Sequence, residues 1–312
     1  MAWLWGVRII GVCAVVVALL GFYLLVFPPS PKERFTFVTA SNPIGIVTIN
    51  TVENTAVILQ IPEDIAIPGA YASGRYPISS LWKMGFLDPK DRGLLSESIE
   101  QSFGIPVDGY VGYTYEQLFE NRDPVESLRD IFSLRGILEL GTGRRVTNIP
   151  PLYLFGLRKK VANVRQSDIK VLDIGRSMSA FEEELPDGTT RFVLDPQRID
   201  VLIKNIFVVD SVREEALSIG VINTTRVPEL ATSLARRLSS SGVFVVSVTS
   251  EERTLEGCEL SGTKAALSSQ TAKFISSIFD CKPVERTGSQ REDLVVRLGK
   301  QNGKMYQPRV TQ

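Results

Sequence analysis

The chain has 312 residues, with 35 Lys and Arg against 35 Asp and Glu, so its net charge is zero. This balance provides no broad basic field, and we expect no nucleic-acid partner. The sequence contains no histidine, which excludes Ser-His-Asp and Cys-His catalysis as well as histidine metal sites.

The N-terminal run Ile9 to Phe27 contains no charged residue. A helix needs about 20 apolar residues to cross a bilayer, and the prolines that follow would end it. We therefore predict a cytoplasmic stub and transmembrane anchor at 1–27 and a Pro-rich spacer at 28–34. A buried core helix and a cleaved signal peptide are the alternatives, and large residues running up to the prolines favour a retained anchor. The flanking charges do not orient the anchor.

Downstream of the spacer, alternating and β-branched runs predict strands at 35–38, 44–50 and 55–61, the last two joined as a hairpin. The Gly- and Pro-rich residues 63–90 predict loops. Apolar stripes and turn signals predict the remaining elements up to residue 210. These are helices at 91–103, 124–134, 151–161 and 196–207, the first closed by Gly104, and strands at 107–113 and 191–194.

A second domain begins near residue 214 with the pattern strand, helix, strand, helix, strand, which predicts a small α/β domain. Its strands are 216–223, 243–248 and 294–298, and its helices 227–238 and 263–279. Thr224 and Thr225 offer N-cap oxygens for the first helix, and Pro228 suits its first turn. We expect the polar tail 301–312 to be disordered.

Of the three cysteines, Cys13 lies in the predicted anchor, where it is an apolar filler. Cys258 and Cys281 form a disulfide if their segment lies outside the cytoplasm, or remain two buried thiols. Spacing alone does not decide between these alternatives. Two cysteines cannot form a tetrahedral zinc site on their own.

The segment VINTTRVPELATSLARRLSSSGVFVVSV, which starts at Val221, resembles the C-terminal domain of LytR-type proteins. Its turn matches at Asn223, Thr225 and Pro228, and LVVRLGK at 294–300 is similar to the final strand of that domain. Thr224, Arg226 and Glu229 replace glycines of the family. The resemblance covers about residues 214–300.

Residues 35–210 resemble the LytR-CpsA-Psr catalytic domain. GIVTINTVENTAVILQIPEDIAIPGAY is similar to its hairpin and Ile-Pro-Arg-Asp signature, and SIEQSFGIPVDGYVGYTYEQL to its helix and Gly-Ile-Pro-Ile-Asp stretch. The resemblance implies an α/β/α fold with its bulk outside the membrane. It also implies attachment of glycopolymers, carried on polyprenyl phosphate, to the bacterial cell wall, with Mg²⁺ or Mn²⁺ if the chain is active.

The departures from this family concern charge. Transfer of a phosphosugar needs arginines that hold pyrophosphate and carboxylates that hold a cation. Glu63 replaces the signature arginine, while Asp64 remains as a cation ligand or a simple turn carboxylate. At an effective dielectric of about 20, a unit charge at contact is worth about 4 kcal/mol. The reversal therefore predicts severely weakened pyrophosphate binding and a degenerate catalytic domain.

Two further basic segments are more simply explained as ordinary surface structure than as binding sites. Gly141 to Arg145 lacks P-loop spacing and indicates an ordinary basic loop rather than a phosphate-cradling turn. The cations Arg158, Lys159, Lys160 and Arg165 indicate a solvated helix face.

We therefore expect a single-pass cell-membrane protein with its bulk outside the cytoplasm, which binds polyprenyl-linked glycopolymer or cell-wall components with transferase activity lost or weakened. The first alternative is an active phosphotransferase in which Arg75, Lys83 and Arg92 are relocated cations. The second alternative is a protein-binding envelope scaffold.

Overall fold

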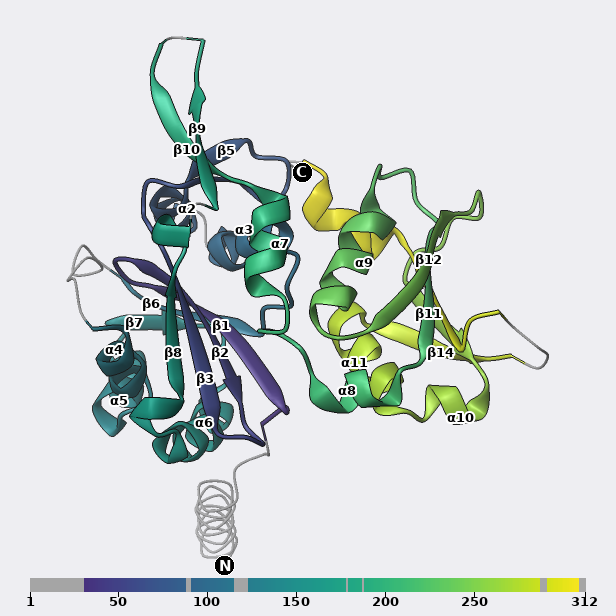
Figure 1. The fold of residues 1–312 in the computed structure, drawn as a ribbon, viewed down its shortest axis with the longest axis horizontal. Coiled ribbons are helices and arrows are strands. Elements are labelled where there is room, and N and C mark those ends of the chain that lie inside the picture. Colours follow the sequence, from purple (N-terminus) through teal and green to yellow (C-terminus); the bar gives the residue numbers. More distant parts are fainter. Residues whose placement is uncertain are drawn as a thin grey trace, which may run out of the picture.

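The computed structural model describes residues 31–87, 91–114, 123–177, 179–186, 188–286 and 291–308. Two α/β parts follow one another along the chain (Figure 1), which agrees with the predicted α/β class. The anchor predicted at Ile9 to Phe27 lies outside the described residues. Within those residues, no helix combines the length and hydropathy that crossing a membrane requires.

A six-stranded sheet forms the centre of the N-terminal part. Its strands are β1 (Arg34–Ala40), β2 (Ile44–Asn50), β3 (Thr55–Ile61), β6 (Gly109–Tyr113), β7 (Arg145–Thr147) and β8 (Ile169–Asp173), in the order β7-β6-β1-β2-β3-β8. The first three form an antiparallel meander, which confirms the predicted hairpin between β2 and β3. β6 and β8 pair in parallel with β1 and β3.

Helices cover both faces of this sheet (Figure 1). One face carries α2 (Ile78–Met84), α3 (Leu94–Phe103) and α7 (Pro196–Ile203), and the other carries α4 (Pro124–Ile131), α5 (Leu134–Gly141) and α6 (Pro151–Asn163). Successive side chains of a strand point to opposite faces. The strand β2 is therefore buried at every position, with Ile46 in one core and Val47 in the other.

Side-chain caps set several helix boundaries that the apolar pattern missed. The predicted helix 124–134 ends earlier, at Ile131, and an unpredicted helix, α5, follows it, capped by Ser133, which accepts a hydrogen bond from the amide of Gly136. The predicted helix 196–207 ends at Ile203, two residues before Asn205 adopts a positive φ of 71°. Gly104, with φ 59°, closes α3 as predicted.

A four-stranded sheet of order β5-β4-β10-β9 lies beside the core that contains α2, α3 and α7. Its strands are β4 (Ala66–Pro68), β5 (Arg75–Pro77), β9 (Ala180–Glu184) and β10 (Thr190–Leu194). Two of these strands and α2 lie within 63–90, where we predicted only loops. Three-residue strands are too short to show alternation, and β4 is stabilised by pairing with the distant β10, where Val193 faces Ala66. Short 3-10 turns at Gln166–Asp168 and Gly175–Ser177 flank β8.

The C-terminal part consists of α8 (Asp210–Glu215) and a five-stranded sheet with its helices. The strands are β11 (Ser218–Asn223), β12 (Phe244–Ser250), β13 (Cys258–Gly262), β14 (Cys281–Glu285) and β15 (Leu294–Leu298), in the order β12-β11-β15-β13-β14. The helices are α9 (Leu230–Ser240), α10 (Lys264–Leu267) and α11 (Gln270–Phe279). β13 and β14 were not predicted, because β13 has only two alternating apolar residues, Cys258 and Leu260, and β14 contains Pro283, which argues against a strand. The predicted helix 263–279 is broken before Ser269, which caps α11.

The prediction of a disordered tail at 301–312 is wrong up to Tyr306, and residues 309–312 lie outside the described residues. A 3-10 helix spans Lys300–Tyr306, and its Gly303 is buried. The Asn302 side chain accepts from the amide of Gly299 (3.1 Å) and donates to the carbonyl of Phe279 (3.1 Å). The carbonyl of Met305 also accepts a hydrogen bond from the amide of Tyr71 in the N-terminal part (2.7 Å). These tertiary contacts order a segment whose local sequence is polar.

Candidate functional site

The segment that resembles the family signature is a surface turn between β3 and β4. Glu63 and Asp64 are both exposed. The carbonyl of Glu63 accepts a hydrogen bond from the hydroxyl of Ser79 at the start of α2 (3.1 Å). Within the described residues, no Lys or Arg forms an ion pair with either carboxylate. The turn therefore presents two negative charges without a neutralising partner.

The three candidate cations of this region are placed by other contacts. Arg75 on β5 pairs with Glu183 of β9 (3.5 Å), which binds Arg191 more closely (2.6 Å). Lys83 is exposed in the last turn of α2. Arg92 is exposed before α3, close enough to Tyr110 to oppose the rise in pKa that burial causes in that phenol. In the described ranges, no group of three or more Asp, Glu or Cys side chains could hold a metal ion.

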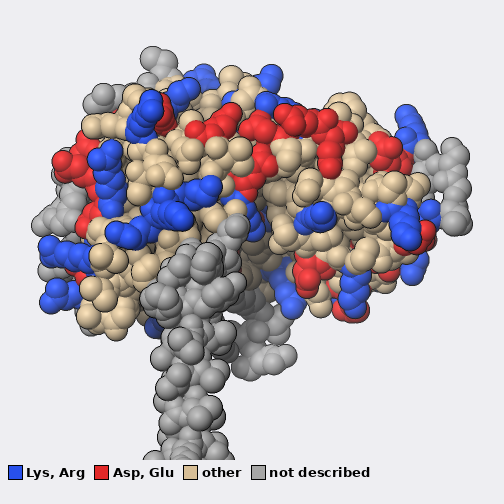
Figure 2. All heavy atoms as spheres, turned by 90° about the horizontal axis from the view of Figure 1, so that it is seen from below, with Lys and Arg blue, Asp and Glu red and all other residues tan. Residues whose placement is uncertain are grey.

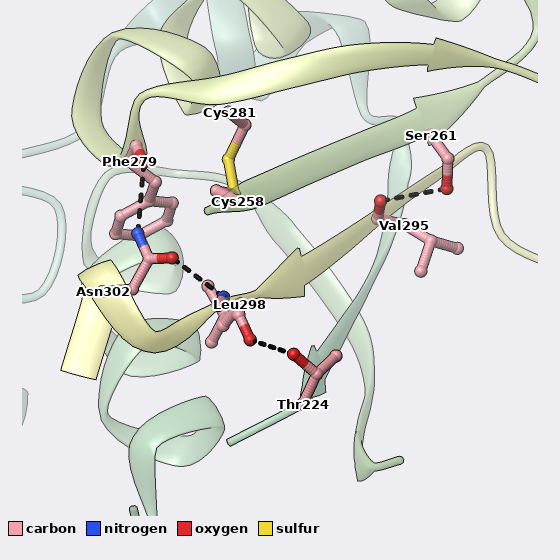
Figure 3. The surroundings of a disulfide bond; sticks show 9 residues. Thr224, Cys258, Ser261, Phe279, Cys281, Val295, Leu298 and Asn302 are labelled. Atoms are coloured by element: carbon pink, nitrogen blue, oxygen red, sulfur yellow. Dashed lines mark hydrogen bonds between the residues drawn. A yellow bond between two sulfur atoms is a disulfide. The ribbon is translucent and has the colours of Figure 1, made fainter. Parts of the chain in front are cut away.

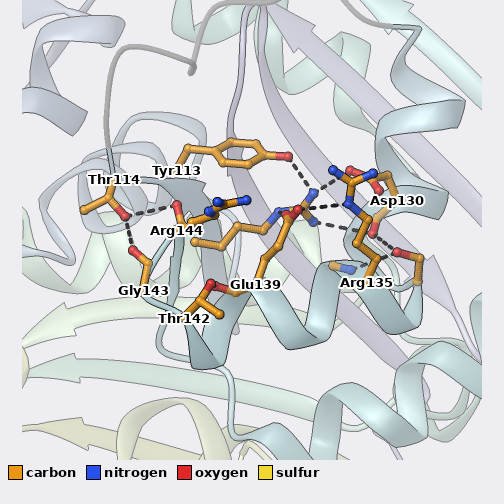
Figure 4. A network of polar contacts seen from close by, with 11 residues as sticks. Tyr113, Thr114, Asp130, Arg135, Glu139, Thr142, Gly143 and Arg144 are labelled. Carbon is orange, nitrogen blue, oxygen red and sulfur yellow. Dashed lines mark hydrogen bonds and ion pairs between the residues drawn. The ribbon is translucent and has the colours of Figure 1, made fainter.

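In the segment predicted as an ordinary basic loop, Gly141 ends α5 and residues 142–144 form an exposed turn, whereas the prediction is wrong for Arg145. Arg145 is 3% exposed and lies in β7. Its Nε contacts Glu139 of α5 (2.8 Å), and its Nη2 contacts Asp130 of α4 and donates to the Tyr113 hydroxyl (2.5 Å). Figure 4 shows these three partners converging on one point. The guanidinium therefore joins α4, α5 and β6.

Gly136 makes this close approach possible. A Cβ at this position would lie 2.1 Å from the carbonyl oxygen of Asp130 and 2.8 Å from Nη1 of Arg145. Because real Cβ atoms do not approach backbone oxygens so closely, only glycine lets α5 pack against α4 and the guanidinium. No sequence motif marks Arg145. Its partners Glu139 and Asp130 lie six and fifteen residues earlier in the chain, and only the fold shows that they contact it.

The other basic segment lines a cavity of about 600 Å³ between α4 and α6. Its cations are Arg129, Arg158 and Lys159, all exposed, and its walls include Phe132 and Phe155. Among the residues that surround this cavity there is no Asp or Glu. The predicted solvated face is thus a positively charged hollow with aromatic walls.

The turn that resembles the LytR-type C-terminal domain is built on Asn223. Its Oδ1 accepts from the amide and the hydroxyl of Thr225 (both 2.8 Å), and its Nδ2 donates to the carbonyl of Val227 (2.8 Å). The predicted N-caps are wrong, because α9 begins later, at Leu230. Pro228 lies in the preceding turn, and Glu229 adopts a φ of 56°, a left-handed conformation that favours glycine.

A cavity of about 450 Å³ lies beside this turn. Thr225, Thr254 and Lys300 line it, following the parallel strands β11, β12 and β15, together with Arg226 and Gln307. The carboxyl ends of parallel strands are a common place for ligands in α/β sheets. Hydroxyl, amide and cationic donors meet there.

No family model matches the chain, and no curated protein matches it. Solved structures similar to it include the transcriptional regulator yvhJ from Bacillus subtilis, with 16% identity and a TM-score of 0.41 over 55% of this chain and 94% of that one. Bacillus subtilis TagV has 13% identity and a TM-score of 0.39 over 55% and 95%. TagT bound to LI-WTA has 16% identity and a TM-score of 0.38 over 55% and 88%. At this level the similarity assigns no activity to this chain.

Cys258 and Cys281 form a disulfide, the alternative that spacing left open (Figure 3). They begin the neighbouring parallel strands β13 and β14 and face each other directly in the register. Their Cα atoms are 4.3 Å apart. The two strands that the sequence pattern did not reveal are therefore joined covalently at their first residues.

Buried charge also joins the two parts of the molecule. Arg237 of α9 pairs with Glu100 of α3 (2.8 Å), and both side chains are largely buried. Burial raises the pKa of Glu100, although the charge of Arg237 opposes this. Beside this pair, Arg236 donates to both carboxylate oxygens of Asp200 (2.9 and 3.0 Å). A cavity of about 430 Å³, lined in part by Tyr71, lies at this junction.

Proposed function

We propose that this chain is a membrane-tethered, extracytoplasmic cell-envelope protein that binds polyprenyl-linked glycopolymer or another cell-wall component with transferase chemistry lost or weakened. The observation that carries the proposal is the exposed turn at Glu63 and Asp64. It resembles a pyrophosphate-binding signature, yet it presents two carboxylates and no ion-paired cation among the described residues. Repulsion at this turn opposes the binding of a reacting pyrophosphate.

Two other features support the location and the ligand class. A disulfide between Cys258 and Cys281 suits an oxidising compartment outside the cytoplasm. The cavity beside the Asn223 turn is lined by Arg226 and by Lys300, whose ammonium group also pairs with Glu256 (2.5 Å), and cations of this kind suit the phosphate groups of an envelope polymer.

The test uses the full-length chain with a lipid-linked pyrophosphate sugar and Mg²⁺ or Mn²⁺. Binding and release of polyprenyl phosphate are measured separately. We expect binding without release, and Asp64→Ala should leave binding unchanged. Turnover that Asp64→Ala abolishes would show an active transferase and overturn the proposal.

A charge reversal gives the second arm of the test. Glu63→Arg restores the family's sign at the turn and should tighten pyrophosphate binding at least tenfold, because attraction replaces repulsion. Glu285→Arg, an equally exposed change on β14, is the matched control and should have no such effect. Equal effects of the two variants would show that the turn does not contact the pyrophosphate.

A further inference from the structure

The hollow between α4 and α6 belongs to a long stretch of chain without carboxylates. From Leu140 to Ser167 the sequence has six Lys and Arg and no Asp or Glu. Arg145 is already paired with Asp130 and Glu139 in its buried cluster. Arg158 and Lys159 point their charge at the surface together with Arg129 from α4.

These three cations differ from three other arginines that lie on helices of the structure. Arg135, Arg198 and Arg213 each pair with a carboxylate one helical turn away. No ion pair joins Arg129, Arg158 or Lys159 to a carboxylate of the described chain. Their positive field is therefore not neutralised locally.

The helix α6 also lies next to the point where the described chain begins. The amide of Lys32 donates to the hydroxyl of Tyr153 in the first turn of α6 (2.7 Å), and Lys160 donates to the carbonyl of Thr51 (3.0 Å). Thr51 in turn donates to the carbonyl of Lys32 (2.8 Å). Figure 2 shows Lys and Arg side chains gathered on this side of the N-terminal part.

The distance to the apolar run is short. Lys32 follows Phe27 by five residue steps, and a fully extended chain spans at most about 18 Å over that length. If residues 9–27 cross the bilayer, as the proposed function requires, α6 is kept within reach of the lipid headgroups.

We propose that the hollow formed by Arg129, Arg158 and Lys159 docks on the phosphate groups of anionic phospholipids at the membrane surface. The inference rests on the tether in the proposed function. The cations supply attraction to an anionic surface, which acts over about a Debye length. Phe155, half-buried at the wall, offers an apolar contact for the glycerol region behind the phosphate. Docking would hold the turn at Glu63 and Asp64, and the C-terminal part, at a fixed orientation above the bilayer.

The test places a photo-crosslinker in the hollow of the full-length chain. Ala162→p-benzoylphenylalanine is suitable because Ala162 is exposed and lines the cavity. Val201→p-benzoylphenylalanine is the control, since Val201 is 76% exposed on α7, on the opposite side of the N-terminal part in Figure 1. The chain is reconstituted into vesicles of phosphatidylcholine with or without about 30% phosphatidylglycerol, so that only one set of vesicles carries the negative surface potential that attracts Lys and Arg.

We expect cross-links to phosphatidylglycerol from position 162, several-fold above phosphatidylcholine and above position 201. Each cation near an anionic surface is worth about fivefold in partitioning. Arg158→Gln with Lys159→Gln should therefore reduce the signal about tenfold or more, whereas Arg158→Lys should retain it. The matched control Lys264→Gln with Lys282→Gln, two exposed cations of the C-terminal part, should change nothing.

Alkaline carbonate flotation, run on the same vesicles, separates this proposal from the proposed function. A chain that does not float overturns the tether and the docking together. A chain that floats but does not cross-link at 162, or cross-links both lipids equally, overturns the docking alone. Loss of the cross-link on adding soluble poly(glycerol phosphate) at low micromolar concentration would show that a polymer phosphate is the occupant, and would overturn the choice of lipid.

Discussion

The N-terminal part joins α4, α5 and β6 through the buried guanidinium of Arg145, whereas the C-terminal part joins β13 to β14 through the bond between Cys258 and Cys281. Both ties fix elements that the sequence pattern did not reveal, such as α5 and β13. The loss of each link destabilises the fold in a different way. Removing the arginine takes a buried counter-charge away from Asp130 and Glu139, while opening the disulfide restores freedom to the unfolded chain.

The largest expected effect comes from Arg145→Met, which breaks the ionic tie. Removal of one partner from a buried ion pair costs about 3–5 kcal/mol. Asp130 keeps some contact with solvent, so the loss should be near the lower figure. Urea unfolding of the full-length chain measures it. The neighbouring exposed change Arg144→Met should stay within about 0.5 kcal/mol, and equal losses at both positions would contradict the cluster's role.

Removal of the covalent tie should have the next largest effect. The cysteines are 23 residues apart, and closing a loop of this size stabilises a fold by about 3 kcal/mol in the chain-entropy account. Cys258→Ser with Cys281→Ser should lower stability by that amount under oxidising conditions. Under reducing conditions the variant and the parent chain should become nearly equal. A difference that persists after reduction would mean that the serines themselves disturb β13 and β14.

Gly136→Ala tests the ionic tie without removing a charge. The new Cβ would meet the carbonyl of Asp130, and such overpacking costs about 1–3 kcal/mol. Gly141→Ala, at the other end of the same helix, has nothing within 4 Å of its Cβ and should be neutral or slightly stabilising. Thermal unfolding of the two variants side by side gives the comparison. Similar losses in both would indicate an effect of helix propensity instead.

Elements defined by local sequence patterns could be predicted, whereas the contacts of Arg145 and of the two cysteines could not. Local patterns were sufficient for the hairpin at 44–61 and for the helix ended by Gly104, because the signals lie within a few residues. Arg145 could not be recognised, since its partners Asp130 and Glu139 belong to helices whose approach depends on Gly136. For the cysteines the pairing was one of two alternatives, and only the parallel register of β13 and β14 decides it.

Resemblance predicted residue positions better than it predicted their contacts. Asn223 and Thr225 do form the turn of the C-terminal part, but Asn223, not either threonine, organises its hydrogen bonds. Glu229, which the resemblance matched to a glycine, adopts a left-handed conformation that favours glycine. At the turn that resembles the family signature, the resemblance identified Glu63. It did not show that Arg75 pairs with Glu183 or that Arg92 lies near Tyr110.

The smallest expected effect concerns the charge between the two parts, which belongs to neither tie. Burial raises the pKa of Glu100 above its ordinary value of 4.5, so the folded chain holds that proton more tightly than the unfolded chain. Stability must then fall as the pH rises from about 4.5 through the raised pKa, and level off above it. Glu100→Gln removes this titration.

We therefore expect the parent chain to lose stability relative to Glu100→Gln over that pH window, in thermal unfolding measured at constant ionic strength. Glu97, whose pKa burial also raises, should give the same sign in Glu97→Gln. Neither variant should alter the effect of Arg145→Met, because distant sites act additively. A parent chain that gains stability relative to Glu100→Gln as the pH rises would show that the attraction of Arg237 outweighs burial. The junction would then be a third tie, comparable in kind to the cluster at Arg145.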